Sequence, residues 1–159
     1  ETTKISFYED TYSLYNLYRF SHYYEEAYGK YIWLKSGASL VIEHTEAMTV
    51  IDVNTGSVLK KKKQEDTLFY QINREAAKEI ARQLRLRNIS GIIMIDFINM
   101  KDTAQKEKLL SLLDSECKKD RVHCNVIDMT ALNLVEMTRS KVRKPLHEQI
   151  RSCMKNNRS

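Results

Sequence analysis

Two aspartates stand at the ends of apolar runs in this sequence. Asp52 lies near the end of the run 47–53, and Asp96 ends the run 91–96. A charge directly after a buried strand is costly unless a partner satisfies it. Neighbouring strand ends of an open α/β sheet face one crevice, so we expect the two carboxylates to meet there. Together with the side-chain oxygen of Asn54, they form a set of hard oxygen ligands that suits Mg²⁺.

These side chains have alternative roles, and the sequence has few other candidates for a catalytic centre. Each aspartate could instead cap the turn that follows its strand. Glu43, Glu46 and Asp128 are further carboxylates at the ends of predicted strands. The four histidines are scattered, and no HExxH motif, Cys/His quartet, GxSxG motif, P-loop or GxGxxG motif occurs. Zinc is therefore not expected, and the predicted cofactor is magnesium, with manganese as a substitute.

Basic residues exceed acidic ones, and the formal net charge is +5. An excess of this size is compatible with an anionic partner but does not require one. The residues with which we expect the chain to contact a nucleic-acid backbone are Lys60, Lys61, Lys62, Lys63, Arg82, Arg85, Arg87 and Arg121. The alternatives are a solvated loop for the lysines, and helix-end or salt-bridge roles for the arginines.

The elements that position these residues follow from hydrophobic periodicity and turn residues. The clearest is a helix over 73–88, in which Ile72, Ala76, Ile80 and Leu84 recur every four residues. The predicted strands are 31–35, 39–45, 47–53, 91–96, 122–128 and 134–138, and the other predicted helices are 12–20, 22–28, 102–120 and one from Pro145 to about Cys153. The tyrosines of the first 30 residues are expected to pack on the sheet, with base stacking as the alternative.

This order of elements predicts an α/β or α+β fold in which helices flank a mixed sheet. Neither an internal repeat nor a long linker divides residues 1–159, so a single domain is expected. The chain does not begin with Met, which suggests a piece of a longer protein. The three cysteines lack CxxC spacing and no secretory or membrane-spanning segment is evident, so we expect reduced thiols in a cytoplasm and no membrane partner.

Long stretches of the sequence resemble the ribonuclease E/G family. They are residues 31–56 (YIWLKSGASLVIEHTEAMTVIDVNTG) and, within 73–100, the segments EAAKEIARQLRLRN and IDFINM. A weaker match continues through KDR at 119–121 and LVEMTR at 134–139. The similarity runs in register from Trp33 to Arg139, so it is far more specific than a short motif.

The resemblance implies a deoxyribonuclease I-like subdomain that holds a catalytic magnesium ion. It assigns the metal to Asp52 and Asp96, and a supporting hydrogen bond to Asn54. The family implies a bacterial, cytoplasmic endoribonuclease that cuts single-stranded RNA, leaves a 5′-phosphate, and takes part in RNA processing and decay. The main alternative is an RNA-binding or structural scaffold domain that does not cleave RNA on its own.

Three features depart from the family pattern. Asn99 replaces the second aspartate of the usual IDFIDM motif. The zinc-sharing CPxC motif is reduced to Cys153-Met154-Lys155-Asn156, and one cysteine cannot supply a protomer's pair of zinc ligands. A homo-oligomer of the full-length protein would therefore not be zinc-linked. The oligonucleotide-binding barrel and the 5′-end sensing region are also absent from these residues.

Overall fold

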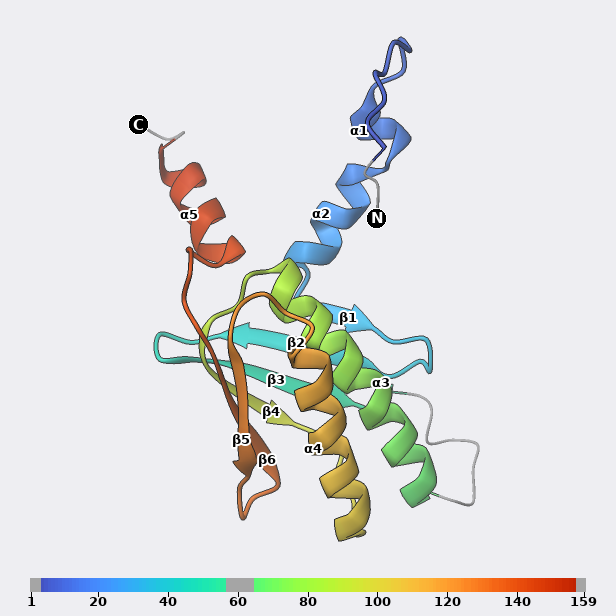
Figure 1. The fold of residues 1–159 in the computed structure, drawn as a ribbon, viewed down its shortest axis with the longest axis vertical. Helices are drawn as coiled ribbons and strands as arrows, with labels where there is room; N and C mark the ends of the chain where they lie inside the picture. Colours follow the sequence, from blue (N-terminus) through green and yellow to red (C-terminus); the bar gives the residue numbers. More distant parts are fainter. Residues whose placement is uncertain (1–3, 57–64, 157–159) are drawn as a thin grey trace.

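The computed structural model describes residues 4–56 and 65–156, which fold around one six-stranded sheet (Figure 1). The strand order is β1-β2-β3-β4-β6-β5. The strands are β1 (Tyr31–Trp33), β2 (Ser39–His44), β3 (Met48–Asn54), β4 (Gly91–Asp96), β5 (Cys124–Met129) and β6 (Leu134–Arg139). The helices are α1 (Leu14–Leu17), α2 (Phe20–Tyr28), α3 (Glu65–Leu86), α4 (Thr103–Cys117) and α5 (Leu146–Asn156). This mixed sheet with flanking helices confirms the predicted fold class.

The centre of the sheet is a parallel pair of strands. β3 and β4 run side by side in the same direction and are joined through α3, whereas the other strand pairings are antiparallel. A parallel pair needs such a crossover because its strands start at the same edge of the sheet. Consequently β3 and β4 also end at the same edge, and the residues that end them become neighbours.

Helices α3 and α4 cover one face of the sheet (Figure 1), and the core lies between them and the strands. On β3, Thr49, Ile51 and Val53 are buried, while the residues between them are only half-buried. This alternation follows from the two-residue period of a strand. The predicted apolar face of α3 is confirmed, since Ile72, Ala76, Ile80 and Leu84 are all buried.

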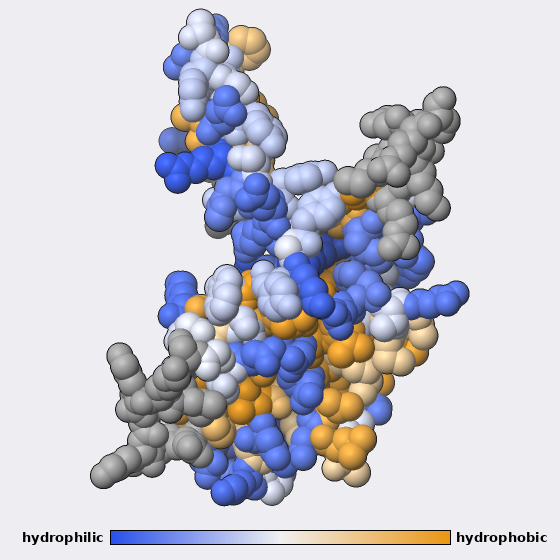
Figure 2. Space-filling view, turned by 180° about the vertical axis from the view of Figure 1, so that it is seen from behind, coloured by the Kyte–Doolittle hydropathy of each residue, from blue (hydrophilic) through white to orange (hydrophobic). Residues whose placement is uncertain are grey.

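The opposite face of the sheet carries no covering helix in the described part of the chain. By the alternation of the strands, Val50 and Asp52 of β3 point to it, as do Met94 and Asp96 of β4. Figure 2 shows the molecule from this rear side, where apolar side chains lie exposed among charged ones. The carboxylates of Asp52 and Asp96 therefore belong to an open surface that a long polymer can reach.

Two sequence-based expectations were wrong. Helix α3 begins at Glu65 rather than Asn73, because Leu68 already belongs to its buried face. The early tyrosines do not pack on the sheet: α1 and α2 project away from it, and Tyr15 and Tyr23 are more than half exposed. Strand and helix bounds otherwise match the predicted elements to within a few residues. None of the helices described is both long and apolar enough to cross a membrane.

Candidate metal centre

Asp52 and Asp96 are direct partners across the parallel pair of strands. Asp52 lies two residues before the end of β3, and Asp96 is the last residue of β4. The strand register pairs Asp52 with Asp96. Adjacent strands lie about 4.8 Å apart, and paired residues point to the same face. The structure thus places the two predicted ligands side by side on the open face of the sheet.

Asn54 supports the first of these carboxylates. Its Nδ2 group donates a hydrogen bond of 2.7 Å to Oδ2 of Asp52. Since residues two apart on a strand share a face, the contact follows directly from the Asp-Val-Asn sequence. The hydrogen bond fixes the rotamer of Asp52, as a supporting residue behind a metal ligand does.

The two carboxylates influence each other electrostatically. Partial burial and the nearby charge of Asp52 raise the pKa of Asp96 above its ordinary value. Like charges this close disfavour ionisation, and a divalent cation between them would relieve the repulsion. This pair of hard oxygen donors fits magnesium, which takes one or two protein carboxylates and keeps several waters. No group of three His, Cys, Asp or Glu side chains suited to a metal occurs in the described residues.

Asn73 is a residue that sequence reasoning missed. It is fully buried in the middle of α3 and forms two hydrogen bonds with the backbone of Ile98. Its Nδ2 donates to the Ile98 carbonyl at 2.7 Å, and its Oδ1 accepts from the Ile98 amide at 3.0 Å. This pair of bonds fixes the loop that directly follows Asp96. A single asparagine inside the apolar stripe of a helix was the sequence signal for such a role.

Two further contacts hold the turn between β1 and β2 at this edge of the sheet. The Glu75 carboxylate on α3 accepts hydrogen bonds from the backbone amides of Lys35 and Ser36, at 2.7 and 3.3 Å. After β3, Gly56 has a φ of +57°, and a Cβ there would lie 2.7 Å from the Gly37 carbonyl oxygen. Only glycine fits such an approach. These contacts therefore hold the β1–β2 turn against α3 and against the segment that follows β3.

The structure does not bring the other predicted carboxylates to this pair. Glu43 forms an ion pair with Lys30. Glu46 lies in the turn between β2 and β3, at the opposite end of β3 from Asp52. Asp128 is on β5, which β6 separates from β4. The site therefore consists of the central pair and Asn54.

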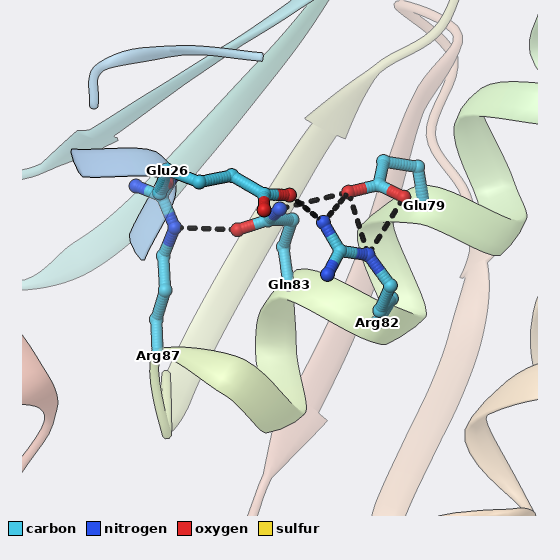
Figure 3. Close-up of polar contacts among 5 residues, drawn as sticks. All are labelled: Glu26, Glu79, Arg82, Gln83 and Arg87. Atoms are coloured by element: carbon cyan, nitrogen blue, oxygen red, sulfur yellow. Dashed lines mark hydrogen bonds and ion pairs between the residues drawn. The ribbon is translucent and has the colours of Figure 1, made fainter. Parts of the chain in front are cut away.

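The arginines near the end of α3 are engaged within the molecule (Figure 3). Arg82 bonds to Glu79 of its own helix and to Glu26 of α2, and the Glu79 bond chiefly raises its pKa. Arg87 is buried. It donates hydrogen bonds to Gln83 Oε1 at 2.6 Å and to the Glu26 carbonyl at 2.9 Å. Both side chains join α2 to α3, and Arg82 does so through the salt-bridge role that is the alternative to RNA binding.

The predicted basic residues lie away from the carboxylate pair wherever the structure describes them. Helix α3 ends just before β4 begins, whereas Asp96 ends β4, so strand β4 separates Arg87 from Asp96 by roughly 17 Å. Arg85 donates to the Glu116 carbonyl at 3.4 Å, and Arg121 is exposed beyond α4. Lys60, Lys61, Lys62 and Lys63 fall outside the described residues.

Comparison with known proteins places this arrangement in a family. A sequence model described as the Ribonuclease E/G family matches residues 1–142. The chain belongs to the ribonuclease E/G family. Ribonuclease G of Escherichia coli K12 is 41% identical over 145 residues, which cover 91% of this chain and 29% of that protein.

Further relatives of the ribonuclease E/G family give the same result. Ribonuclease G of Haemophilus influenzae is 42% identical over 143 residues, or 90% of this chain and 29% of that protein. Ribonuclease E of a Nostoc species is 42% identical over 115 residues, or 72% of this chain and 17% of that protein. The chain thus spans less than a third of these curated relatives. The family match contains Asp52, Asn54, Asn73 and Asp96, while α5 lies beyond it.

Proposed function

We propose that this chain carries the catalytic centre of a magnesium-dependent endoribonuclease. The reaction is hydrolysis of phosphodiester bonds in single-stranded RNA, leaving a 5′-phosphate on the downstream product. The relatives' names, ribonuclease G and ribonuclease E, support the class of reaction. The observation that carries the proposal is the register pairing of Asp52 with Asp96 at the ends of parallel strands.

The residues of the centre have distinct roles in this proposal. Asp52 and Asp96 would hold the cation through their carboxylates, and the amide of Asn54 keeps Oδ2 of Asp52 in place. Asn73 positions the loop after Asp96 through Ile98. Magnesium bound there would supply Lewis acidity to a phosphoryl oxygen and to an attacking water. The uncovered sheet face leaves room for an RNA strand to lie across the pair.

Contacts to the RNA backbone belong to the basic residues. Arg85 and Arg121 have fewer intramolecular partners than Arg82 and Arg87, so we expect them to contribute more to RNA binding. These side chains lie far from the carboxylates and would contact nucleotides distant from the scissile bond. The run at 60–63 follows Asn54 closely in the sequence and would reach phosphates nearer the cleavage site.

Metal binding provides a direct test that does not depend on turnover. Manganese titration of the chain, followed by electron paramagnetic resonance, should show one site that Asp52→Asn and Asp96→Asn each weaken at least about tenfold. The matched control is Asp114→Asn, which makes the same change of charge on α4, where Asp114 pairs with Lys118. Unchanged manganese affinity in either strand-end variant would remove that residue from the centre.

Cleavage is tested with the same three variants and a labelled single-stranded RNA. Magnesium-dependent cutting, lost in both strand-end variants and kept in Asp114→Asn, supports the proposal. A 5′-phosphate-dependent exonuclease then identifies the product ends. RNA binding without magnesium-dependent cutting, together with manganese affinity that is unchanged in both strand-end variants, would instead favour the scaffold alternative.

A further inference from the structure

Two cysteine thiols meet where α4 passes into β5, away from the metal centre. Cys117 is the last residue of α4 and is 3% exposed. Cys124 is the first residue of β5 and is half-buried against the same core. The two side chains interact directly, since the neighbouring thiol is the largest influence on the pKa of each. Neither residue takes part in the proposed ribonuclease centre.

The connection between the two cysteines is an ordered turn. The Asp120 amide donates to the Cys117 carbonyl at 2.9 Å, and the Val122 amide donates to Oδ1 of Asp120 at 2.9 Å. Arg139, which is the strand partner of Cys124, donates from Nε to Oδ2 of Asp120 at 2.9 Å. Arg139 and Asp120 are both buried at this ion pair. The turn and the ion pair keep the thiols in contact.

The surroundings make the two thiols chemically unequal. The adjacent Cys117 thiol and the positive charge of Arg139 lower the pKa of Cys124, although burial and the charge of Asp120 act in the opposite direction. The adjacent Cys124 thiol, together with burial, raises the pKa of Cys117. The thiolate is the reactive form, and it is favoured beside a cation. Cys124 is therefore the nucleophile of the pair, and Cys117 is the thiol that can displace a group attached to it.

We propose that Cys117 and Cys124 form a reversible disulfide with each other when they react with a low-molecular-weight disulfide such as oxidised glutathione. The Cys124 thiolate attacks one sulfur of the oxidant, breaks its S–S bond and releases one glutathione thiolate. Cys117 then attacks the Cys124 sulfur, its proton passes to the departing second glutathione thiolate, and the protein disulfide forms. Two protein thiols are oxidised and one glutathione disulfide is reduced to two thiols.

Peptide mapping of the unaltered chain tests this pairing. The reduced protein is treated with oxidised glutathione, its free thiols are blocked with N-ethylmaleimide, and it is digested with trypsin. Lys118, Lys119 and Arg121 lie between the two cysteines, so trypsin separates them into peptides 109–118 and 122–139. We expect these two peptides to remain joined until a reductant is added, and the free thiols to fall from three to one.

Variants identify the partner of each thiol. Cys153→Ser removes the third cysteine and should leave the linked peptides unchanged. Cys124→Ala and Cys117→Ala should each abolish them, and Cys117→Ala should accumulate glutathione on Cys124. Circular dichroism of the reduced and oxidised wild type confirms that the fold persists. Two results would overturn the proposal. The first is wild-type protein that keeps glutathione on Cys124 while Cys117 is free to react with N-ethylmaleimide. The second is a disulfide from either residue to Cys153.

Discussion

The carboxyl group of Asp96 is held in an unfavourable environment when no cation is present. Its pKa is raised by partial burial and by the charge of Asp52. The native state therefore binds a proton more readily than the unfolded chain, and stability falls as pH rises through the interval between the two pKa values. At neutral pH the ionised Asp96 side chain slightly opposes folding. This residue of the proposed centre therefore lowers the stability of the metal-free protein.

This environment predicts that Asp96→Asn does not destabilise the metal-free protein. We expect the free energy of unfolding at neutral pH to hold or to rise by about 0.5 kcal/mol, because Asp96 is largely exposed and solvent screens the repulsion. The gain should disappear at low pH, where the wild-type carboxyl is protonated. Urea unfolding in a chelator, with Asp114→Asn as control, measures the difference, and a loss above 1 kcal/mol would show a structural role instead.

His44 gives a second residue-level prediction. Its ring stacks on His147 with centroids 3.8 Å apart, and its Nδ1 lies 3.0 Å from Thr49 Oγ1. Burial, then the charges of His147 and Arg87, lower the pKa of His44 to about 4, although Glu148 acts in the opposite direction. The unfolded chain, with a pKa near 6.5, thus takes up this proton first.

The contribution of His44 to stability is present above pH 6.5 and is lost as pH falls to about 4. At full burial the shift would correspond to about 3 kcal/mol, and because His44 is only half-buried we expect about 1 kcal/mol. Unfolding at several pH values should show a shallower loss in His44→Gln than in the wild type. His22→Gln, at an exposed position on α2, is the control and should follow the wild-type curve.

At the level of single residues, the sequence predicted the juxtaposition of Asp52 and Asp96 better than it predicted side-chain partners. Asp52 and Asp96 could be placed together because both follow apolar strands, and strand ends have few possible positions. The distant partner of Arg82 and Arg87 could not be found, since Glu26 stands 56 residues before Arg82 and belongs to a different helix. Such a pairing depends on how α2 docks, which no local pattern encodes.

Among the elements, α3 links the core to the loop after β4. Asn73 is fully buried, and its donor and its acceptor are both used by Ile98. We expect Asn73→Ala to lower the free energy of unfolding by about 2–3 kcal/mol, because it leaves the partly buried amide and carbonyl of Ile98 unpaired. Asn125→Ala, an exposed change on β5, should cost much less.

A positioning role for Asn73 has a second consequence. The loosened loop should also weaken manganese binding at Asp96, although Asn73 does not touch the metal. Titration of the folded variant at low temperature separates this effect from unfolding. Unaltered affinity for manganese in a destabilised Asn73→Ala would limit the residue to a structural role.

The same residue shows why element bounds were harder to predict than element types. The four-residue recurrence of apolar side chains predicts a helix from residue 73. The structure extends α3 by two further turns, in which Leu68 and Ile72 are buried. The tyrosines of α1 and α2 were expected in the core because aromatic residues are usually buried there. Their exposure depends on the docking of these helices, which composition does not determine.

Across the whole molecule, charge and surface shape bear on how RNA would be held. The net charge is +5, yet two of the predicted arginines are committed to ion pairs or hydrogen bonds inside the protein. By the alternation of β3 and β4, the carboxylate pair lies on the sheet face that no described helix covers. Binding to single strands usually relies on aromatic platforms in a groove together with charge. An open face with dispersed cations should attract RNA but bind it only weakly.

We therefore expect these 159 residues alone to bind single-stranded RNA weakly and to cut it slowly or not at all. Such electrostatic binding weakens steeply as salt is added. In a plot of the logarithm of the binding constant against the logarithm of the salt concentration, each phosphate contact adds about 0.7 to the steepness of the slope. Replacing Lys60–Lys63 with glutamine should reduce that slope by up to about 3 if all four contact phosphates. Fluorescence anisotropy at several salt concentrations, with ribonuclease G of E. coli as the comparison, measures both quantities. Tight, salt-insensitive binding and rapid magnesium-dependent cutting by the 159-residue chain would show that the sheet and its carboxylate pair suffice for positioning the substrate.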